Sequence, residues 1–193
     1  ISKSEALAKA EKGDHKCQLN LATYYMIYED NMDTARLWLM KIINSNYSPY
    51  SSSAAVAMTS TYAIEANLGK KLTKQELMNL AAWWFVANGL IAHDKAAGIE
   101  NNLDGISLGS FYAIFPKYIE DEFTEKELSA IEGMFNHLLT TFFPEIFEIR
   151  TETQTSKKAD NKIHIYDETK FGKLYIKIRH SSTVWVNGGY LAY

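Results

Sequence analysis

Residues 10–47 carry the pattern that most limits what this chain can fold into. Small and large apolar residues recur there at helical spacing in two stretches, which a polar break at residues 29–33 separates. The apolar positions are Cys17, Leu21, Ala22 and Tyr25 in the first stretch and Ala35, Trp38, Leu39 and Ile42 in the second. The pattern predicts two short antiparallel helices. Because such a pair cannot bury its own apolar face, it needs a neighbour to stack on.

A second copy of the pattern follows at residues 54–90. Residues 58–62 align with residues 21–25, and a longer loop at residues 67–73 separates the two predicted helices of this copy. The second helices align as Ala81 and Trp84 with Ala35 and Trp38. Recurrence of the pattern on both helices, in the same order, predicts two stacked helical hairpins.

Four aromatic residues have a predicted place in this stack. We expect Trp38, Tyr62 and Trp84 to fill the space between helices, where large rings at these spacings are usually buried. Trp83 points about 100° away from Trp84 on the same helix. It therefore either packs on a third unit or is exposed as an anchor for a partner.

Several helix ends can be placed from local signals. Gly13 ends a first helix over residues 3–12, and the carboxylate of Asp14 can cap the next helix. Capping boxes pair Thr73 with Glu76 and Thr124 with Glu127. The second box opens a helix to about residue 142, with Leu128, Ile131, Phe135 and Leu138 on one stripe. Pro144 ends this helix, which we expect to close the stack.

Two stretches lack regular patterning. Residues 44–53 contain Pro49 and five serines, so they are predicted to form a loop. From residue 89 to residue 109, four glycines are expected to interrupt any long helix. We expect shorter helices near 90–103 and 106–119, the second of them apolar and buried against the last repeat.

The composition changes after residue 150. Residues 151–162 are polar and are predicted to be a linker or exposed loop. Residues 163–193 then alternate apolar and polar positions, with Asn187-Gly188 as a hairpin turn. This predicts a small antiparallel β-sheet that is not stable alone. We therefore expect a helical domain over residues 1–150 and a linker with a β appendage over residues 151–193.

The first unit resembles a Sel1-like repeat, a bacterial relative of the tetratricopeptide repeat. The resemblance covers about residues 5–95, although the family has Ala at the position of Cys17, Gly at that of Ala22 and a glycine-rich turn at residues 29–32. The residues that carry it are Ala10, Gly13, Asp14, Cys17, Gln18, Leu21, Ala22, Tyr25, Asp33, Ala35, Trp38 and Lys41. The resemblance implies a right-handed stack of antiparallel helix pairs that binds other proteins without catalysing a reaction.

The net charge, the cysteine count and the absence of known catalytic motifs argue against several classes of function. A net charge of −3 argues against a broad nucleic-acid-binding surface. Cys17 is the only cysteine, which excludes an intrachain disulfide and favours a buried structural role. No phosphate-binding loop, nucleophile elbow or zinc-protease motif is present. His164 and His180 could face each other across the tail hairpin as a metal pair, but ordinary exposed histidines are the favoured reading.

The chain offers no apolar run of roughly 18–20 residues, so we expect no integral membrane segment. It begins with Ile1, which fits a mature exported protein and a trimmed cytosolic one equally well. A periplasmic or a cytoplasmic location in a bacterium is therefore expected.

We expect a mainly α-helical, short Sel1-like solenoid that binds another protein and has no catalytic residue, cofactor or metal. Within this class, an immunity protein that inhibits a cognate secreted bacterial toxin is favoured over a general adaptor or regulator. A hydrolytic enzyme with its site in the C-terminal β region is the remaining alternative. The predicted partner-binding residues are Asn20, Tyr24, Tyr28, Thr61, Glu65 and Trp83.

Overall fold

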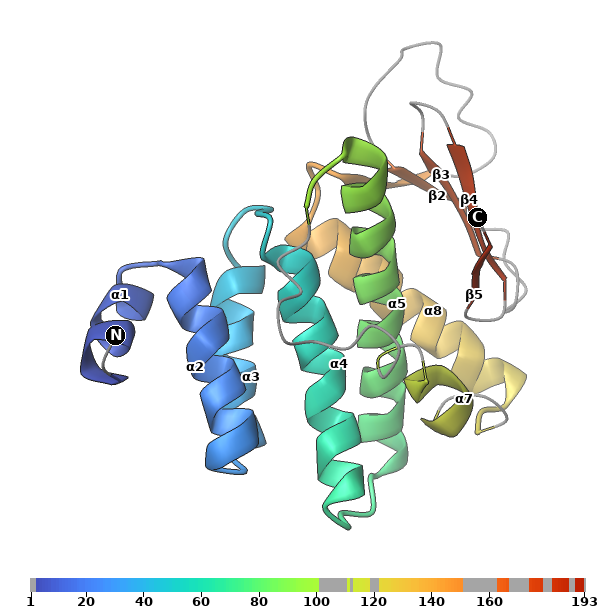
Figure 1. Cartoon of the computed structure of the whole chain (residues 1–193). Helices are drawn as coiled ribbons and strands as arrows, with labels where there is room; N and C mark the ends of the chain where they lie inside the picture. Colours follow the sequence, from blue (N-terminus) through green and yellow to red (C-terminus); the bar gives the residue numbers. More distant parts are fainter. Residues whose placement is uncertain are drawn as a thin grey trace.

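The computed structural model describes residues 3–100, 111, 113–118, 122–150, 163–166, 174–178, 182–187 and 190–192, with the backbone alone at residues 115–116 and from residue 148 onward. The chain is mainly helical (Figure 1). The helices are α1 (Lys3–Glu11), α2 (His15–Tyr28), α3 (Met32–Ile43), α4 (Ser51–Asn67), α5 (Lys74–Ala97), α7 (Ile114–Tyr118) and α8 (Glu125–Phe142). No helix in these ranges is long and apolar enough to cross a membrane.

Successive helices lie side by side in a row that runs from α1 through α2, α3, α4 and α5 to α8 (Figure 1). The pairs α2–α3 and α4–α5 form two helical hairpins, and α3 packs on α4 where the hairpins meet. The three aromatic residues that were expected to fill the space between helices are buried: the exposed fractions are 8% for Trp38, 8% for Tyr62 and 0% for Trp84. The two hairpins therefore share one apolar core, which also contains Cys17.

The helix caps follow the local sequence signals. Gly13 has φ = +92°, a value that favours glycine, and it separates α1 from α2. The Asp14 carboxylate then accepts a hydrogen bond of 2.9 Å from the Cys17 N–H at the start of α2. The predicted capping boxes of α5 and α8 are both confirmed. Hydrogen bonding within a few residues was enough to predict these ends.

The capping box of α5 also predicts a pH-dependent stability. The Lys70 ammonium, together with the Thr73 N–H, lowers the pKa of Glu76 from 4.5 to about 2. The ionised Glu76 carboxylate thus stabilises the fold above pH 4.5, and this contribution is lost as the pH falls toward 2. Glu76→Gln should lower the free energy of unfolding by about 1 kcal/mol at pH 7. Urea unfolding at several pH values should show this difference shrinking below pH 4.5. A difference that stays constant down to pH 2.5 would contradict the assignment.

Two sequence predictions about loops and breaks are wrong. Residues 51–53 do not belong to a loop: they form the first turn of α4, and all three serine side chains are fully buried. Gly89 does not interrupt a helix either, because it is buried within α5, which is continuous to Ala97. The helix expected near 90–103 is therefore the end of α5, which stops at Gly98 with φ = +67°.

The remaining helices are predicted in part. α8 begins and ends where expected, with Ile131 and Phe135 buried and Pro144 just past its end. Of the helix expected near 106–119, the structure describes α7 and Phe111, while residues 101–110 lie outside the described residues. Phe111 is buried, and its carbonyl oxygen accepts a hydrogen bond of 3.3 Å from Trp84 Nε1.

Five short strands follow α8: β1 (Phe147–Arg150), β2 (Ile163–Tyr166), β3 (Leu174–Ile178), β4 (Ser182–Asn187) and β5 (Tyr190–Ala192). Their order in the sheet is β1-β2-β3-β4-β5. β1 runs parallel to β2, and each later pair is antiparallel. The predicted linker at 151–162 lies outside the described residues, and a separate β appendage stays a prediction.

Candidate functional site

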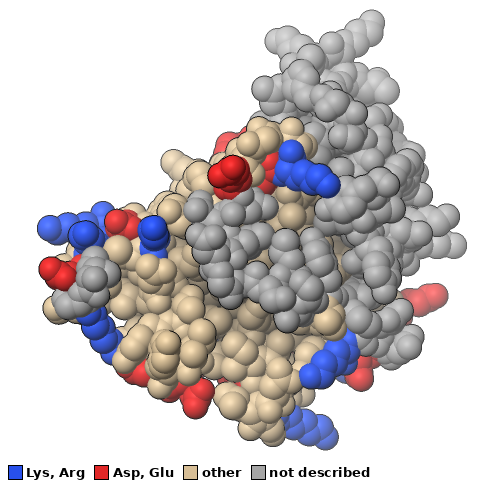
Figure 2. Space-filling view, in the orientation of Figure 1, with Lys and Arg blue, Asp and Glu red and all other residues tan. Residues whose placement is uncertain are grey.

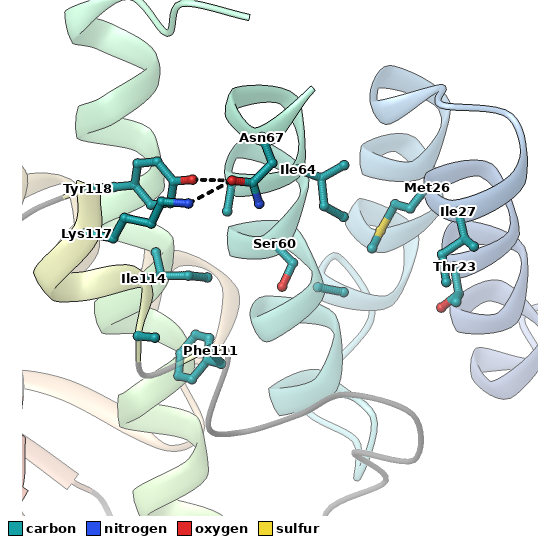
Figure 3. A pocket seen from close by; sticks show the side chains of 13 residues that line it. Thr23, Met26, Ile27, Ser60, Ile64, Asn67, Phe111, Ile114, Lys117 and Tyr118 are labelled. Atoms are coloured by element: carbon teal, nitrogen blue, oxygen red, sulfur yellow. Dashed lines mark hydrogen bonds between the residues drawn. The ribbon is translucent and has the colours of Figure 1, made fainter. Parts of the chain in front are cut away.

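An open groove of about 520 Å³ lies between α2, α4 and the segment around α7 (Figure 3). Most of its lining is apolar. The residues that line it are Thr23, Met26, Ile27, Ala57, Ser60, Ala63, Ile64, Asn67, Phe111, Ala113, Ile114, Lys117 and Tyr118. The volume is within the range of about 300–1,000 Å³ that is usual for binding pockets in proteins.

Helical spacing explains which side chains of α2 and α4 enter the groove. Thr23 and Ile27 are four residues apart on α2, so they lie on one face, one turn from each other. On α4, Ser60, Ile64 and Asn67 share a face in the same way. The lining of α4 covers residues 57–67, which corresponds to about 15 Å along the helix. The groove is thus long enough for about three turns of a partner helix.

Small residues leave the space that the groove occupies. Small residues line the groove at every third position of α4: Ala57, Ser60 and Ala63. The Ser60 hydroxyl donates a hydrogen bond to the Val56 carbonyl oxygen within the helix. Large lining side chains such as Met26, Phe111 and Ile114 are buried. Ile27 at the α2 edge is 59% exposed, which is high for an isoleucine. An apolar partner that covers Ile27 would gain the free energy of removing this side chain from water.

The third wall is α7, and two contacts hold it in place. One is the hydrogen bond from Trp84 on α5 to the Phe111 carbonyl, supported by stacking of the two rings with centroids 5.8 Å apart. The other involves Asn67 at the end of α4. Its Oδ1 accepts hydrogen bonds from Lys117 Nζ at 2.8 Å and from the Tyr118 hydroxyl at 2.7 Å (Figure 3). These contacts place α7 opposite α2.

Hydrogen-bond donors outnumber acceptors at the Asn67 end of the groove. Two donors share the one Asn67 oxygen, and the Asn67 amide N–H₂ group adds further donors. Lys117 supplies the only charge among the described lining residues, which include no carboxylate. On the described part of the face seen in Figure 2, Lys, Arg, Asp and Glu lie mainly around the edges, and the other described residues lie between them. We call Asn67, Lys117 and Tyr118 the donor-rich end.

The predicted partner-binding residues on α2 are on the surface but outside the groove. Asn20 is exposed, and Tyr28 is 75% exposed. Tyr24 is half-buried between Tyr28 and Lys3, with ring centroids 5.4 Å from Tyr28 and Lys3 Nζ 4.2 Å from its ring centre. The groove is instead lined by Thr23 and Ile27, which directly precede Tyr24 and Tyr28 in the sequence.

On α4 and α5 the predicted residues face the interior of the stack. Thr61 is fully buried, and Trp83 is 7% exposed, so of the two alternatives for Trp83 the structure has the packed one. Glu65 is 14% exposed and ion-paired. The groove again uses the preceding residues of α4, Ser60 and Ile64. Four of the six predicted residues, Tyr24, Tyr28, Thr61 and Glu65, thus lie one position after a groove residue, about 100° further around the helix.

Arg36 on α3 explains why Thr61 and Glu65 are not free surface residues. Its Nε donates to the Thr61 hydroxyl at 2.9 Å, and its guanidinium also bonds the Glu65 carboxylate. The guanidinium lies 4.1 Å from the centre of the Tyr62 ring. Glu65 in turn contacts Lys70 at 2.9 Å. These side chains join the two hairpins where α3 meets α4.

A second group of polar side chains lies near the end of α5. The Tyr47 hydroxyl donates to the buried Asp94 carboxylate, which His93 Nδ1 also approaches at 3.2 Å. Burial and the bond to Asp94 raise the pKa of Tyr47 well above 10, so this phenol remains protonated. The contacts tie the 44–50 loop to α5, and Tyr47 N–H binds Glu145 at 2.7 Å.

The search for a metal site covers only part of the chain. Across the ranges whose side chains are described, no three His, Cys, Asp or Glu residues are grouped to hold a metal ion. The side chains of His164 and His180 lie outside the described residues. Comparison of the chain with family models, with curated proteins and with solved structures gave no match. The case for function therefore rests on the groove of a mainly helical protein.

Proposed function

We propose that this chain is a non-enzymatic scaffold that binds an apolar segment of another protein in the groove between α2, α4 and α7. The observation that carries the proposal is the groove itself, which is apolar, open and edged by the 59% exposed Ile27. Its length along α4 suits an amphipathic helix of about ten residues with anchors at i, i+3 or i+4, and i+7. The occupant is therefore a polypeptide segment.

The helical row supports a wider proposal about architecture. We propose that the two hairpins are Sel1-like units of a short solenoid, whose first helices, α2 and α4, form the binding side. Both of these helices line the groove, as the first helices of such pairs are expected to do. The C-terminal strands would then form a small β appendage on this solenoid.

We further propose a dedicated partner, such as a secreted toxin that this chain inhibits as an immunity protein. The net charge of −3 and a groove long enough for about three turns of a helix suit a one-to-one complex better than a hub. A toxin gene next to the gene of this chain, and tight binding of its product, would support this version. Capture of several unrelated sequences in the same groove would favour an adaptor.

A pair of matched variants tests the groove. Ile27→Glu places a carboxylate at its edge, whereas Leu37→Glu makes the same change at a 66% exposed position on α3 that does not line the groove. The probe is a phage-displayed library of random 16-residue peptides selected on the full chain. We expect the selected peptides to carry two or three large apolar residues at helical spacing. Ile27→Glu should weaken their binding at least tenfold, because an apolar side chain would then desolvate a charge.

Leu37→Glu should leave peptide binding unchanged, and thermal melting should show that both variants are folded. Ser60→Phe provides a second test, because the added ring fills the groove between α2 and α4. The proposal is wrong if no peptide is selected, or if the selected peptides bind both groove variants as tightly as the native chain.

A further inference from the structure

We infer that the donor-rich end of the groove binds an acidic side chain of the partner segment, an inference that rests on the proposed function. Lys117 Nζ donates one hydrogen bond to a neutral acceptor, the Asn67 oxygen, which it shares with the Tyr118 hydroxyl. An ammonium group has three donors, so Lys117 has donors left for a ligand. A carboxylate supplies two acceptor oxygens and the opposite charge.

The charge of the groove supports the same ligand. The chain as a whole is acidic, with 23 Asp and Glu against 20 Lys and Arg. The described lining nevertheless holds one cation and no anion. Three of the other described lysines are ion-paired: Lys3 with Glu29, Lys70 with Glu65 and Glu76, and Lys74 with Glu127. Among the described residues, Lys117 contacts the neutral Asn67 amide oxygen and the Tyr118 ring, whose centre lies 4.7 Å from its Nζ, and it forms no ion pair. Within this part of the chain, its charge is therefore available to a partner.

A side-chain carboxylate fits better than the carboxylate of a chain end. Recognition of a C-terminus usually relies on a nest of backbone N–H groups. Here the α4 residue at the donor-rich end is Asn67, the last residue of its helix, where the backbone presents carbonyl oxygens. The donors in this place are the side chains of Asn67, Lys117 and Tyr118. The partner segment therefore carries Asp or Glu at the end that meets α7, and apolar residues along α2 and α4.

Charge reversal at one position tests this inference. The peptide library is selected on the native chain, on Lys117→Glu and on Lys126→Glu, the last being an exposed lysine of α8 outside the groove. We expect Asp or Glu at a fixed position in peptides selected on the native chain and on Lys126→Glu. Peptides selected on Lys117→Glu should carry Lys or Arg at that position. Synthetic peptides that differ only by Glu or Gln there should differ about fivefold in Kd for the native chain.

Salt and peptide ends complete the test. The fivefold preference should shrink in 0.5 M NaCl because the contact is exposed. It should persist when the peptide C-terminus is amidated. Selection without any charge preference, or equal weakening of the Glu and Gln peptides by Lys117→Glu, would overturn the inference. The apolar anchors and their sensitivity to Ile27→Glu would then still support the proposed function, whereas loss of both results would reject the two proposals together.

Discussion

Replacing Trp84 by alanine should lower the free energy of unfolding by about 3–5 kcal/mol, which is the usual cost of deleting a large buried aromatic side chain. Trp84 is fully buried in the shared core, where its ring stacks on Phe111 and meets the edge of Phe85 at a centroid distance of 5.2 Å. Urea unfolding followed by circular dichroism measures the loss. Trp84 also donates a hydrogen bond to the carbonyl oxygen of Phe111, which lines the groove. The same change should therefore weaken peptide binding in the groove.

A second variant at Trp84 separates the contributions of the ring and the hydrogen bond, and a variant of an exposed tyrosine serves as the control. Trp84→Phe keeps a ring in the core but removes the hydrogen bond to Phe111, so it should cost about 1–3 kcal/mol. Tyr28→Ala removes an aromatic ring that is 75% exposed and should change stability by less than about 0.5 kcal/mol. If Trp84→Ala were no more damaging than Tyr28→Ala, the two hairpins would not share the core described here.

Replacing Arg36 by methionine should lower the free energy of unfolding by about 2–3 kcal/mol. The guanidinium is 17% exposed and combines an ion pair with Glu65, a hydrogen bond to Thr61 and a contact with the Tyr62 ring. Breaking one side of a buried ion pair costs about 3–5 kcal/mol, because the other charge stays behind. The loss here is smaller, since Lys70 still neutralises Glu65.

Arg36→Lys should recover little of this loss, because an ammonium cannot form the forked contact with Glu65 and Thr61 while stacking on Tyr62. Asp33→Asn is the matched control. Asp33 also contacts Arg36, at 3.3 Å, but its side chain is 93% exposed, so its loss should be undetectable. If Arg36→Met and Asp33→Asn lowered the free energy of unfolding equally in urea, the contacts of Arg36 with Glu65, Thr61 and Tyr62 would add no stability.

Local sequence signals predicted the parts of the fold that local hydrogen bonds determine. The caps at Asp14, Thr73 and Thr124 depend on residues three positions apart, and all three are present. Tertiary packing overrode the local signal elsewhere. Residues 51–53 favour a loop by composition, yet burial among neighbouring helices keeps them helical. Gly89 is tolerated in α5 for the same reason, because packing around a buried helix outweighs about 1 kcal/mol of propensity.

The groove could not be predicted from the sequence, for two physical reasons. α4 is buried on nearly all sides from Ser51 to Thr59, so its apolar residues do not mark the one face that lines the groove. The third wall depends on contacts between Asn67 and residues 50 and 51 positions later in the chain. No periodic pattern predicts a contact of that separation. That the first helices of the two hairpins form the binding side stays a prediction.

The three walls of the groove differ in how much of the protein depends on them. α2 and α4 are core helices, whereas α7 has five residues, lines the groove with Ile114, Lys117 and Tyr118, and is joined to α4 by the hydrogen bonds of Lys117 and Tyr118 to Asn67. Substitutions at Ala113, Lys117 and Tyr118 can therefore change which ligand is accepted while the helical stack keeps its stability. A library that randomises these three positions is the economical route to engineered binders built on this chain.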